Sequence, residues 1–456
     1  IVLLVNYTPF QNFLARKAAS ILSDKIKTKV EIAHIRIDFL NHLLVQGVLI
    51  EDQAKDTLLY AGELQVRLTD IIFSKDVPTI HYVGLQNTYA HLYRTPVSKE
   101  WNYQFIADAL GNNNKSASSK KQSIELDLKK VLLENVRFHM DDQWVGENLD
   151  FDIGNLVINT KALNFTKELL DVTKIDISKA NISIKEYTGG RPPKVKKTHP
   201  WQELPYKTPF NPGNWVVTVK KLSLNDCRFQ FSNREGVSDS GVFDPSHIAV
   251  SNIGLSAEDI AIHGDTLQGN IVNLHAEERS GIAIKTMRSK VSVSPNAAIC
   301  KGLYLKTNHS TLQNYYAMHY KHFPAFNYYI DSVTMEAHLN DAVVDERDIA
   351  YFAPRLKTFP AIVLKVSGDG LGTVADLGAK NLVVSDGLTT VKTNVTMKGL
   401  PDIYQTLISC TETEIITSGA GILHYVPSLR NSPEIALEHI ALAYFKGDYT
   451  GYIENF

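Results

Sequence analysis

LLENVRFHMD, residues 132–141, shows most clearly the residue pattern from which the fold follows. Val136, Phe138 and Met140 alternate with polar residues, and successive side chains of a strand point to opposite faces. The stretch therefore predicts a β-strand with one apolar face. Leu133 lies out of phase with this alternation across the Glu-Asn pair, which predicts a phase slip such as a β-bulge that keeps a sheet coiling.

The same pattern recurs along the chain. Apolar and polar side chains alternate in residues 63–68, and the units 175–184 and 222–229 repeat the kinked form with Asn or Asp at the kink. We predict that these strands share one apolar face, with Glu63, Arg67 and Arg137 outside it. The predicted members of the face are Leu64, Val66, Leu68, Val136, Phe138, Met140, Ile175, Ile177, Ile182, Ile184, Phe229 and Phe231.

The sequence predicts many strands and few helices. Strands are expected at 31–40, 44–51, 58–70, 80–94, 101–110, 124–142, 149–159 and 172–187, and again from Trp215 onward. Later helices are expected at 311–320 and 345–353, with a further candidate at 401–407. Because no helix follows each strand, the sheet is predicted to be a mainly antiparallel meander.

Composition divides the chain into segments. The predicted segments are the exit end of a membrane anchor at 1–7, an amphipathic helix at 8–28, sheet at 29–110, a flexible loop at 111–122, sheet at 123–187, a Pro-rich loop at 188–214, and further sheet with short helices at 215–456, continuing past the last residue.

The apolar face of such a sheet must be covered by a second sheet, by the sheet itself or by something other than protein. Twenty or so strands spaced about 4.8 Å apart would extend on the order of 100 Å, and twisted open sheets rarely exceed about 10 strands without curling or splitting. We therefore predict a mainly β fold, an elongated antiparallel sheet curled into an apolar groove. A groove of this kind suits acyl chains.

The bulk composition argues against several function classes. Of the 456 residues, 47 are basic and 49 acidic, and the net charge of −2 argues against nucleic acid as a partner. The three cysteines lack the spacing of a zinc site, and His319 has no carboxylate near it in sequence at metal-binding spacing. GDGLGT at 368–373 lacks the ending of a phosphate loop and is interpreted as a tight turn. We expect no catalytic residue, metal or cofactor, and no enzyme activity.

The N-terminus predicts contact with a membrane. Residues 1–5 are apolar but too few to span a bilayer, which takes about 20 residues. We interpret them as the exit end of a signal anchor, with a buried first strand as the alternative. The next helix, 8–28, is predicted to be amphipathic and to lie on the membrane, to plug the end of the sheet or to pack on the core. The residues assigned to the membrane are Ile1, Leu3, Leu4, Val5, Phe10, Phe13 and Leu14.

Five segments carry a resemblance to a known family. They are TPFQNFL at 8–14, KVEI at 29–32, LVQGVLIED at 44–52, DERDIAYFAP at 345–354 and GLPD at 399–402. In this order, after an apolar exit segment, they resemble the N-terminal part of the TamB proteins of the AsmA-like superfamily, in particular those of Bacteroidetes-type bacteria. The resemblance covers most of the chain as a pattern of strands and contains no catalytic signature.

The resemblance implies a periplasmic protein anchored in the inner membrane through its N-terminus. Its β-groove would reach toward the outer membrane and, through a C-terminal part beyond residue 456, a BamA/TamA-type barrel. The resemblance also implies a likeness to chorein-type bridge lipid carriers. Two functions remain: a conduit whose groove carries phospholipid acyl chains between membranes, and a scaffold whose strand edges engage a barrel or a client during outer-membrane protein assembly.

Overall fold

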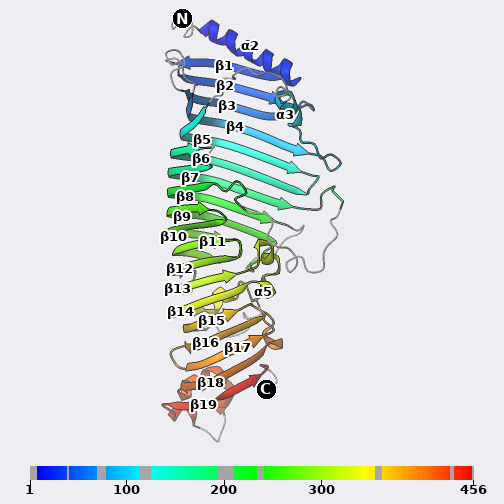
Figure 1. Ribbon diagram of the computed structural model, residues 1–456. Helices are drawn as coiled ribbons and strands as arrows, with labels where there is room; N and C mark the ends of the chain where they lie inside the picture. Colours follow the sequence, from blue (N-terminus) through cyan, green and yellow to red (C-terminus); the bar gives the residue numbers. More distant parts are fainter. Residues whose placement is uncertain are drawn as a thin grey trace.

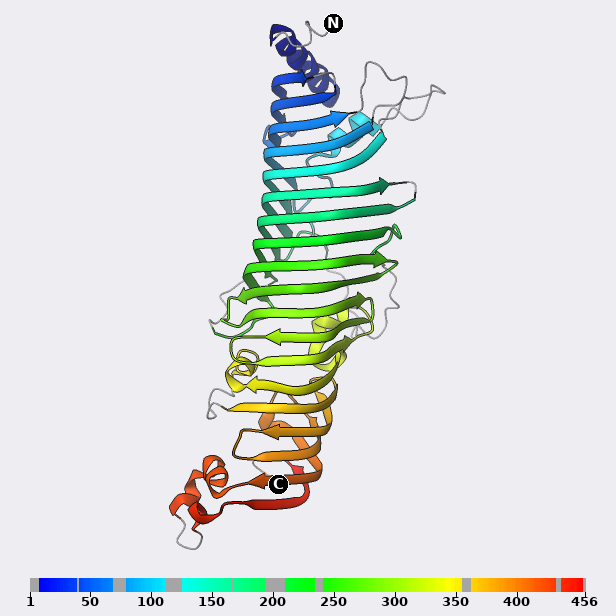
Figure 2. The same ribbon diagram turned by 90° about the vertical axis from the view of Figure 1, so that its left-hand side faces the viewer.

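The computed structural model describes residues 8–38, 41–68, 79–111, 125–165, 167–192, 210–233, 241–354, 362–431 and 436–453. These residues form a single open sheet of 19 strands. Each strand pairs with the strands that precede and follow it in the sequence, so the order of the sheet is the order of the chain. The sheet is long and curled about its length (Figure 1, Figure 2).

Strands dominate the chain from end to end. They are β1 (Val30–Asp38), β2 (His42–Glu51), β3 (Thr57–Leu68), β4 (Thr79–Arg94), β5 (Glu125–Asp142), β6 (Glu147–Asn164), β7 (Leu169–Glu186), β8 (Val216–Ser232), β9 (His247–His263), β10 (Thr266–Glu278), β11 (Ala283–Ser294), β12 (Ala297–Lys306), β13 (Thr311–His319), β14 (Thr334–Asp345), β15 (Val363–Gly372), β16 (Asp376–Ser385), β17 (Thr390–Lys398), β18 (Leu407–Thr417) and β19 (Ala443–Gly451).

Helices are few and most are short. The α-helices are α2 (Thr8–Ile26), α3 (Gln104–Gly111), α5 (Tyr329–Ser332), α6 (Glu346–Ile349) and α7 (Gly419–Tyr425), and the 3-10 helices are η1 (Phe323–Tyr328), η3 (Ile403–Gln405), η4 (Pro427–Asn431) and η5 (Leu437–His439). The prediction of a mainly β fold is confirmed.

Two neighbouring pairs depart from the antiparallel pattern. β4 pairs with β5, and β7 with β8, in parallel, whereas the other neighbours are antiparallel. Parallel neighbours need a connection that runs from the end of one strand back to the start of the next. These connections are residues 95–124, which contain α3, and residues 187–215, which contain the predicted Pro-rich loop. Residues 112–124 and 193–209, which include most of the predicted loops at 111–122 and 188–214, lie outside the described residues.

Each predicted phase slip contains a residue with a left-handed backbone, which is Asn or Asp as predicted in β5 and β8 but Lys179 in β7. Asn135 in β5, Lys179 in β7 and Asp226 in β8 have φ values of 52°, 53° and 52°. In β5 the consecutive residues Glu134 and Asn135 are both exposed, and Val136 returns to half-burial. Two outward residues therefore stand where simple alternation allows one, while the register with β4 and β6 continues unshifted across Asn135, so the slip is not a β-bulge against either neighbour.

Three sequence predictions are wrong. Residues 101–110 were predicted as a strand but contain helix α3, whose Phe105, Ile106 and Ala109 pack together on α2 and the first strands. The predicted helix at 311–320 is strand β13, and the predicted tight turn at 368–373 belongs to strand β15 apart from its last residue. In β15 the glycines still make ladder pairs, such as Gly370 with neighbours in β14 and β16, so the absence of side chains does not end the strand.

Two other predicted helices are shorter than expected. The helix predicted at 345–353 is the single turn of α6, whose start is capped by the Asp345 carboxylate accepting from the Arg347 backbone N–H at 3.0 Å. The candidate at 401–407 is the 3-10 turn η3. Both are turns between strands, because the adjacent residues already belong to β14 and β18.

Fully buried apolar side chains gather at two places on the described sheet. At the first strand, Ala19 and Ile26 of α2 pack on Val30, with Ile32 and Ile50 beside them. Farther along, the residues around η1 and α5 pack on β12 and β13. Between these places the apolar residues of the sheet are mostly half-buried.

Candidate functional site: the apolar face of the sheet

The register of the strands joins apolar side chains into rows that run along the sheet. Cross-strand partners point to the same face, so a chain of partners defines a row. One row runs without a polar residue from β1 to β13. Its members are Ile35, Val45, Leu64, Leu85, Leu133, Leu156, Ile177, Leu224, Leu255, Leu274, Met287, Leu305 and Leu312.

Three further rows repeat this pattern. One contains Ile37, Leu43, Val66, Val83, Val131, Ile158, Ile175, Leu222, Ala257 and Ile271. Another contains Val30, Ile50, Leu59, Ala90, Phe138, Phe151, Ile182, Phe229 and Val250. The third contains Leu92, Met140, Leu149, Ile184, Phe231 and Ile248.

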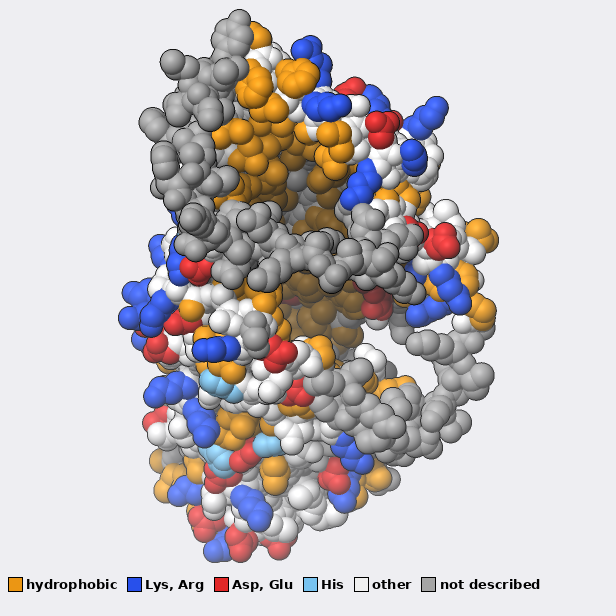
Figure 3. Space-filling model, turned by 45° about the horizontal axis from the view of Figure 1, so that its top comes forward, with side chains coloured by type: hydrophobic (Ala, Val, Ile, Leu, Met, Phe, Trp, Pro, Cys, Tyr) orange, Lys and Arg blue, Asp and Glu red, His pale blue; other side chains and the backbone are white. Residues whose placement is uncertain are grey.

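The phase slips place all four rows on one face. Without a slip, Leu133 and Val136 would point to opposite sides of β5, because their spacing is odd. The extra outward residue at Asn135 restores Val136 to the side of Leu133. The same device in β8 brings Leu224 and Phe229 to one side. Figure 3 shows the result: hydrophobic side chains gather in a hollow between the polar edges of the sheet.

The structure brings the predicted members of the apolar face together. Eleven of the twelve fall in or beside these rows: Leu64, Val66, Phe138, Met140, Ile175, Ile177, Ile182, Ile184, Phe229 and Phe231 are row members, and Val136 pairs with Ile153. Leu68 pairs with Ile80 after a shift of register. Sequence analysis missed the members in β1, β2, β4 and β6 and those in β9 to β13.

The apolar face is incompletely covered by the described residues. Phe138, Ile177, Ile182 and Phe229 are each half-buried, although cross-strand neighbours such as Phe151, with ring centroids 6.3 Å from Phe138, already contact them. A packed second layer would bury such side chains fully. The face can therefore take up further apolar material along these strands.

The opposite face is polar, as predicted. Glu63 accepts from Gln46 Nε2 at 2.9 Å, and hydrogen bonds from Gln65 and Gln46 hold the pKa of its carboxyl below the usual value. Arg137 lies 3.9 Å from Asp152, and both side chains are largely exposed.

A buried ion pair joins the C-terminal ends of the parallel strands β4 and β5. The Arg94 guanidinium donates to both carboxylate oxygens of Asp142, at 2.7 and 2.6 Å, and the side chains are 16% and 8% exposed. Burial opposes ionisation of Asp142, but the hydrogen bonds from Arg94 and the Val145 backbone N–H outweigh it and lower the pKa. The Arg94 guanidinium also lies 4.7 Å from the centre of the Trp101 ring.

A chain of titratable groups crosses β13, β14 and β15. His338 Nδ1 lies 2.7 Å from Asp369 Oδ1, and its Nε2 lies 3.0 Å from Glu336 Oε1. The other Glu336 oxygen lies 2.9 Å from His319 Nε2. The partner of His319 thus comes from the neighbouring strand, a proximity that sequence spacing does not reveal. The hydrogen bonds to Asp369 and Glu336 raise the pKa of His338.

Helix α2 lies along the first strand and exposes large apolar side chains. Its buried face consists of Gln11, Ala15, Ala19 and Ile26, whereas Phe13 and Ile21 are each 54% exposed and Leu22 is 39% exposed. Phe10 and Leu14 are half-buried. The other residues assigned to the membrane, Ile1, Leu3, Leu4 and Val5, lie outside the described residues.

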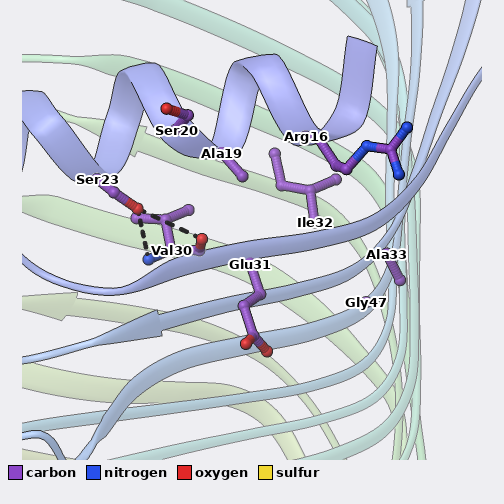
Figure 4. Close-up of a pocket in the computed structure, with 9 residues that line it drawn as sticks. All are labelled: Arg16, Ala19, Ser20, Ser23, Val30, Glu31, Ile32, Ala33 and Gly47. Atoms are coloured by element: carbon purple, nitrogen blue, oxygen red, sulfur yellow. Dashed lines mark hydrogen bonds between the residues drawn. The ribbon is translucent and has the colours of Figure 1, made fainter. Parts of the chain in front are cut away.

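Small side chains leave a pocket between α2 and β1 (Figure 4). Ser23 Oγ accepts from the Val30 backbone N–H at 2.9 Å and ties the helix to the strand. Gly47 of β2 approaches the same place with φ 61°, and a Cβ there would lie 2.7 Å from Ala33 Cβ. The pocket is a consequence of this close packing, with Arg16 and Glu31 on its wall.

Comparison with protein-family models, with curated proteins and with solved structures finds no match for this chain. Among the helices that the structure describes, none has the length and apolar character needed to cross a membrane. In the same residues, no group of three or more His, Cys, Asp or Glu side chains has the arrangement of a metal site.

Proposed function

We propose that this chain carries phospholipid acyl chains in an apolar groove formed by the curled sheet, as a periplasmic bridge between the inner and outer membranes. The observation that supports the proposal best is the row from Ile35 to Leu312, which is apolar at every strand from β1 to β13. Members such as Leu133 and Ile177 are half-buried in the described structure. An acyl chain laid along such rows gains about 0.8 kcal/mol for each methylene removed from water.

The distribution of charge supports a lipid with its head group in water. The four rows contain no charged residue, so only hydrocarbon is favoured on the apolar face. Ion pairs such as Arg94 with Asp142 lie at the ends of the strands, and exposed pairs such as Arg137 with Asp152 lie on the outer face. Head groups would therefore pass along the open side of the groove.

The N-terminal helix supports a membrane at the β1 end. In our proposal α2 acts as an amphipathic helix: Phe13 and Ile21 are exposed, and Lys17 and Lys25 flank them on the helix. The anchor in the inner membrane and the link to a BamA/TamA-type barrel are proposed from the sequence resemblance to TamB proteins.

The test replaces Phe138 or Ile177 with Asp. Each carboxylate would stand in the path of acyl chains, where an unpaired charge costs several kcal/mol. Water can reach half-buried positions, so we expect both variants to fold. Lipid photo-crosslinking through a probe at Leu224 and outer-membrane integrity should both be lost, with barrel binding unchanged.

The matched control is Arg137→Asp, which puts the same group on the outer face of the same strand. It should leave crosslinking unchanged. Cooperative loss of folding in Phe138→Asp and Ile177→Asp would assign these positions to a sealed protein core and contradict the proposal.

The alternative function is a scaffold for outer-membrane protein assembly. It is favoured by β19, which pairs with β18 alone among the described strands and where Tyr444 and Phe445 are 55% and 54% exposed, next to Leu442 at 71%. An edge strand with exposed apolar side chains can accept a further strand from a client. If the Asp variants fold, exclude lipid and still support normal growth, the scaffold replaces the conduit.

A further inference from the structure

One described segment lies on the apolar face itself. Residues 320–333, which include η1 and α5 and which we call the aromatic segment, connect β13 to β14. Ala325 and Val333 of this segment are 1% and 0% exposed. They belong to a cluster that includes Ala298 of β12 and Met318 of β13.

Ala298 and Met318, the seat on which the aromatic segment packs, belong to another apolar row. This row runs from β6 to β14 and contains Leu163, Leu170, Val217, Ile262, Leu267, Val293, Ala298, Met318 and Met335. The aromatic segment therefore covers positions equivalent to those that stand open farther up the sheet.

Tyr329 extends the cover across β13. Its hydroxyl lies 3.4 Å from the hydroxyl of Tyr316 and 3.8 Å from the sulfur of Met318. Burial, together with the contact to Tyr329, raises the pKa of Tyr316. Tyr316 is half-buried, as Phe138 is, and it differs from Phe138 in being contacted by the aromatic segment.

The lining of the face changes at the same place. The long row ends at Leu312, because the ladder between β13 and β14 slips after Thr311. Beyond it the partners of Tyr316 are Ala337 and then Gly370, and the row through Met335 reaches Gly372. These residues offer little or no side-chain area to an acyl chain, although a separate apolar row, Ala342, Val366, Val384, Val391 and Ile415, continues across the same strands.

We propose that the aromatic segment is a gate in the groove, an inference that rests on the proposed conduit. When seated, it ends the acyl-chain compartment at β13. When it leaves its seat, Met318 and Tyr316 become available to lipid, and the compartment joins the face of β14 to β19. Phe326, Tyr328 and Ile330 are 37%, 41% and 42% exposed, so an arriving acyl chain meets apolar surface on the gate.

The experiment places a photo-crosslinking amino acid at one of two positions and incubates the protein with phospholipid vesicles. The positions are Leu224, on the β1 side of the gate, and Leu377, the partner of Gly372 on the β19 side. In the wild type we expect crosslinking at Leu377 to be about tenfold weaker than at Leu224, because the seated gate keeps acyl chains from passing β13. Removing the gate's rings with Tyr329→Ala and Phe323→Ala should raise the signal at Leu377 severalfold.

The matched control is Phe352→Ala, which removes an aromatic ring that pairs with Phe243 at 5.3 Å outside the aromatic segment. It should change neither signal. Tyr329→Phe keeps the ring and loses only the hydroxyl contacts, so it provides a folded variant with a smaller rise at Leu377 if the alanine variants fail to fold. Equal crosslinking at both positions in the wild type, or no rise in folded gate variants, overturns the gate. Absence of lipid at both positions overturns the conduit as well.

Discussion

Arg94 is the residue whose loss should matter most for stability at the edge of β4 and β5. Removing it leaves the Asp142 carboxylate buried without its charge partner. We expect Arg94→Ala to lower the free energy of unfolding by about 3 kcal/mol, measured by urea denaturation. The control Arg137→Ala removes an exposed pair and should cost less than about 1 kcal/mol. Equal losses in the two variants would contradict this assignment.

His338 should make thermal stability depend on pH. Both of its ring nitrogens face carboxylates, and only the imidazolium can donate from both. Its pKa is raised by folding, so its stabilising effect is complete below the unfolded value of about 6.5 and is lost as the pH rises through the raised pKa.

The measurement is the melting temperature of the wild type and His338→Gln between pH about 6 and 9. The wild type should lose more stability than the variant above pH about 6.5. His91, whose pKa burial lowers, acts only below that range and does not disturb the comparison. Parallel curves for the two proteins would show that His338 is not the group responsible.

Single residues also decided where sequence reasoning failed. The spacing of Leu312 and Tyr316 imitates one turn of a helix, but four residues are also two repeats of a strand, so the pattern fits β13 equally well. Asn135 was readable as a slip because clear alternation surrounds it on both sides.

At the scale of elements, α2 gives the clearest test of membrane contact. Phe13→Asp should weaken flotation of the protein with liposomes, because it removes apolar area from the exposed side of the helix, and Leu14→Asp, at the half-buried position beside it, should act in the same direction. Ser20→Asp adds the same charge at another exposed position and should float normally. If Phe13→Asp floats like the wild type, α2 only caps the edge of β1.

Elements were predicted best where they repeat and worst where distant parts meet. Strands from β1 to β8 follow from alternation alone. Helix α3 does not, because its Phe105 and Ile106 are explained only by α2 and β1, which lie far away in sequence. The parallel pairing of β4 with β5 was also missed, since the direction of a strand depends on its connection.

At the scale of the whole molecule, each strand bonds only to its sequence neighbours, so stability should be local. We expect Arg94→Ala to speed hydrogen exchange in β4 and β5 and to leave exchange in β14 to β19 unchanged, measured by mass spectrometry of peptides. Faster exchange throughout the sheet would indicate one cooperative unit instead.

The two parallel pairs also determine the order in which the chain can fold. Most strands join their predecessor through a short turn, such as the one at Gly264 between β9 and β10. Strands β5 and β8 must wait for about thirty residues to return across the sheet, and closing such a connection costs about 2 kcal/mol more entropy than closing a two-residue turn. Nucleation should therefore restart at β5 and at β8. A chain delivered N-terminus first can complete β1 to β4, then β5 to β7, and then the remainder, so that no long edge waits unpaired.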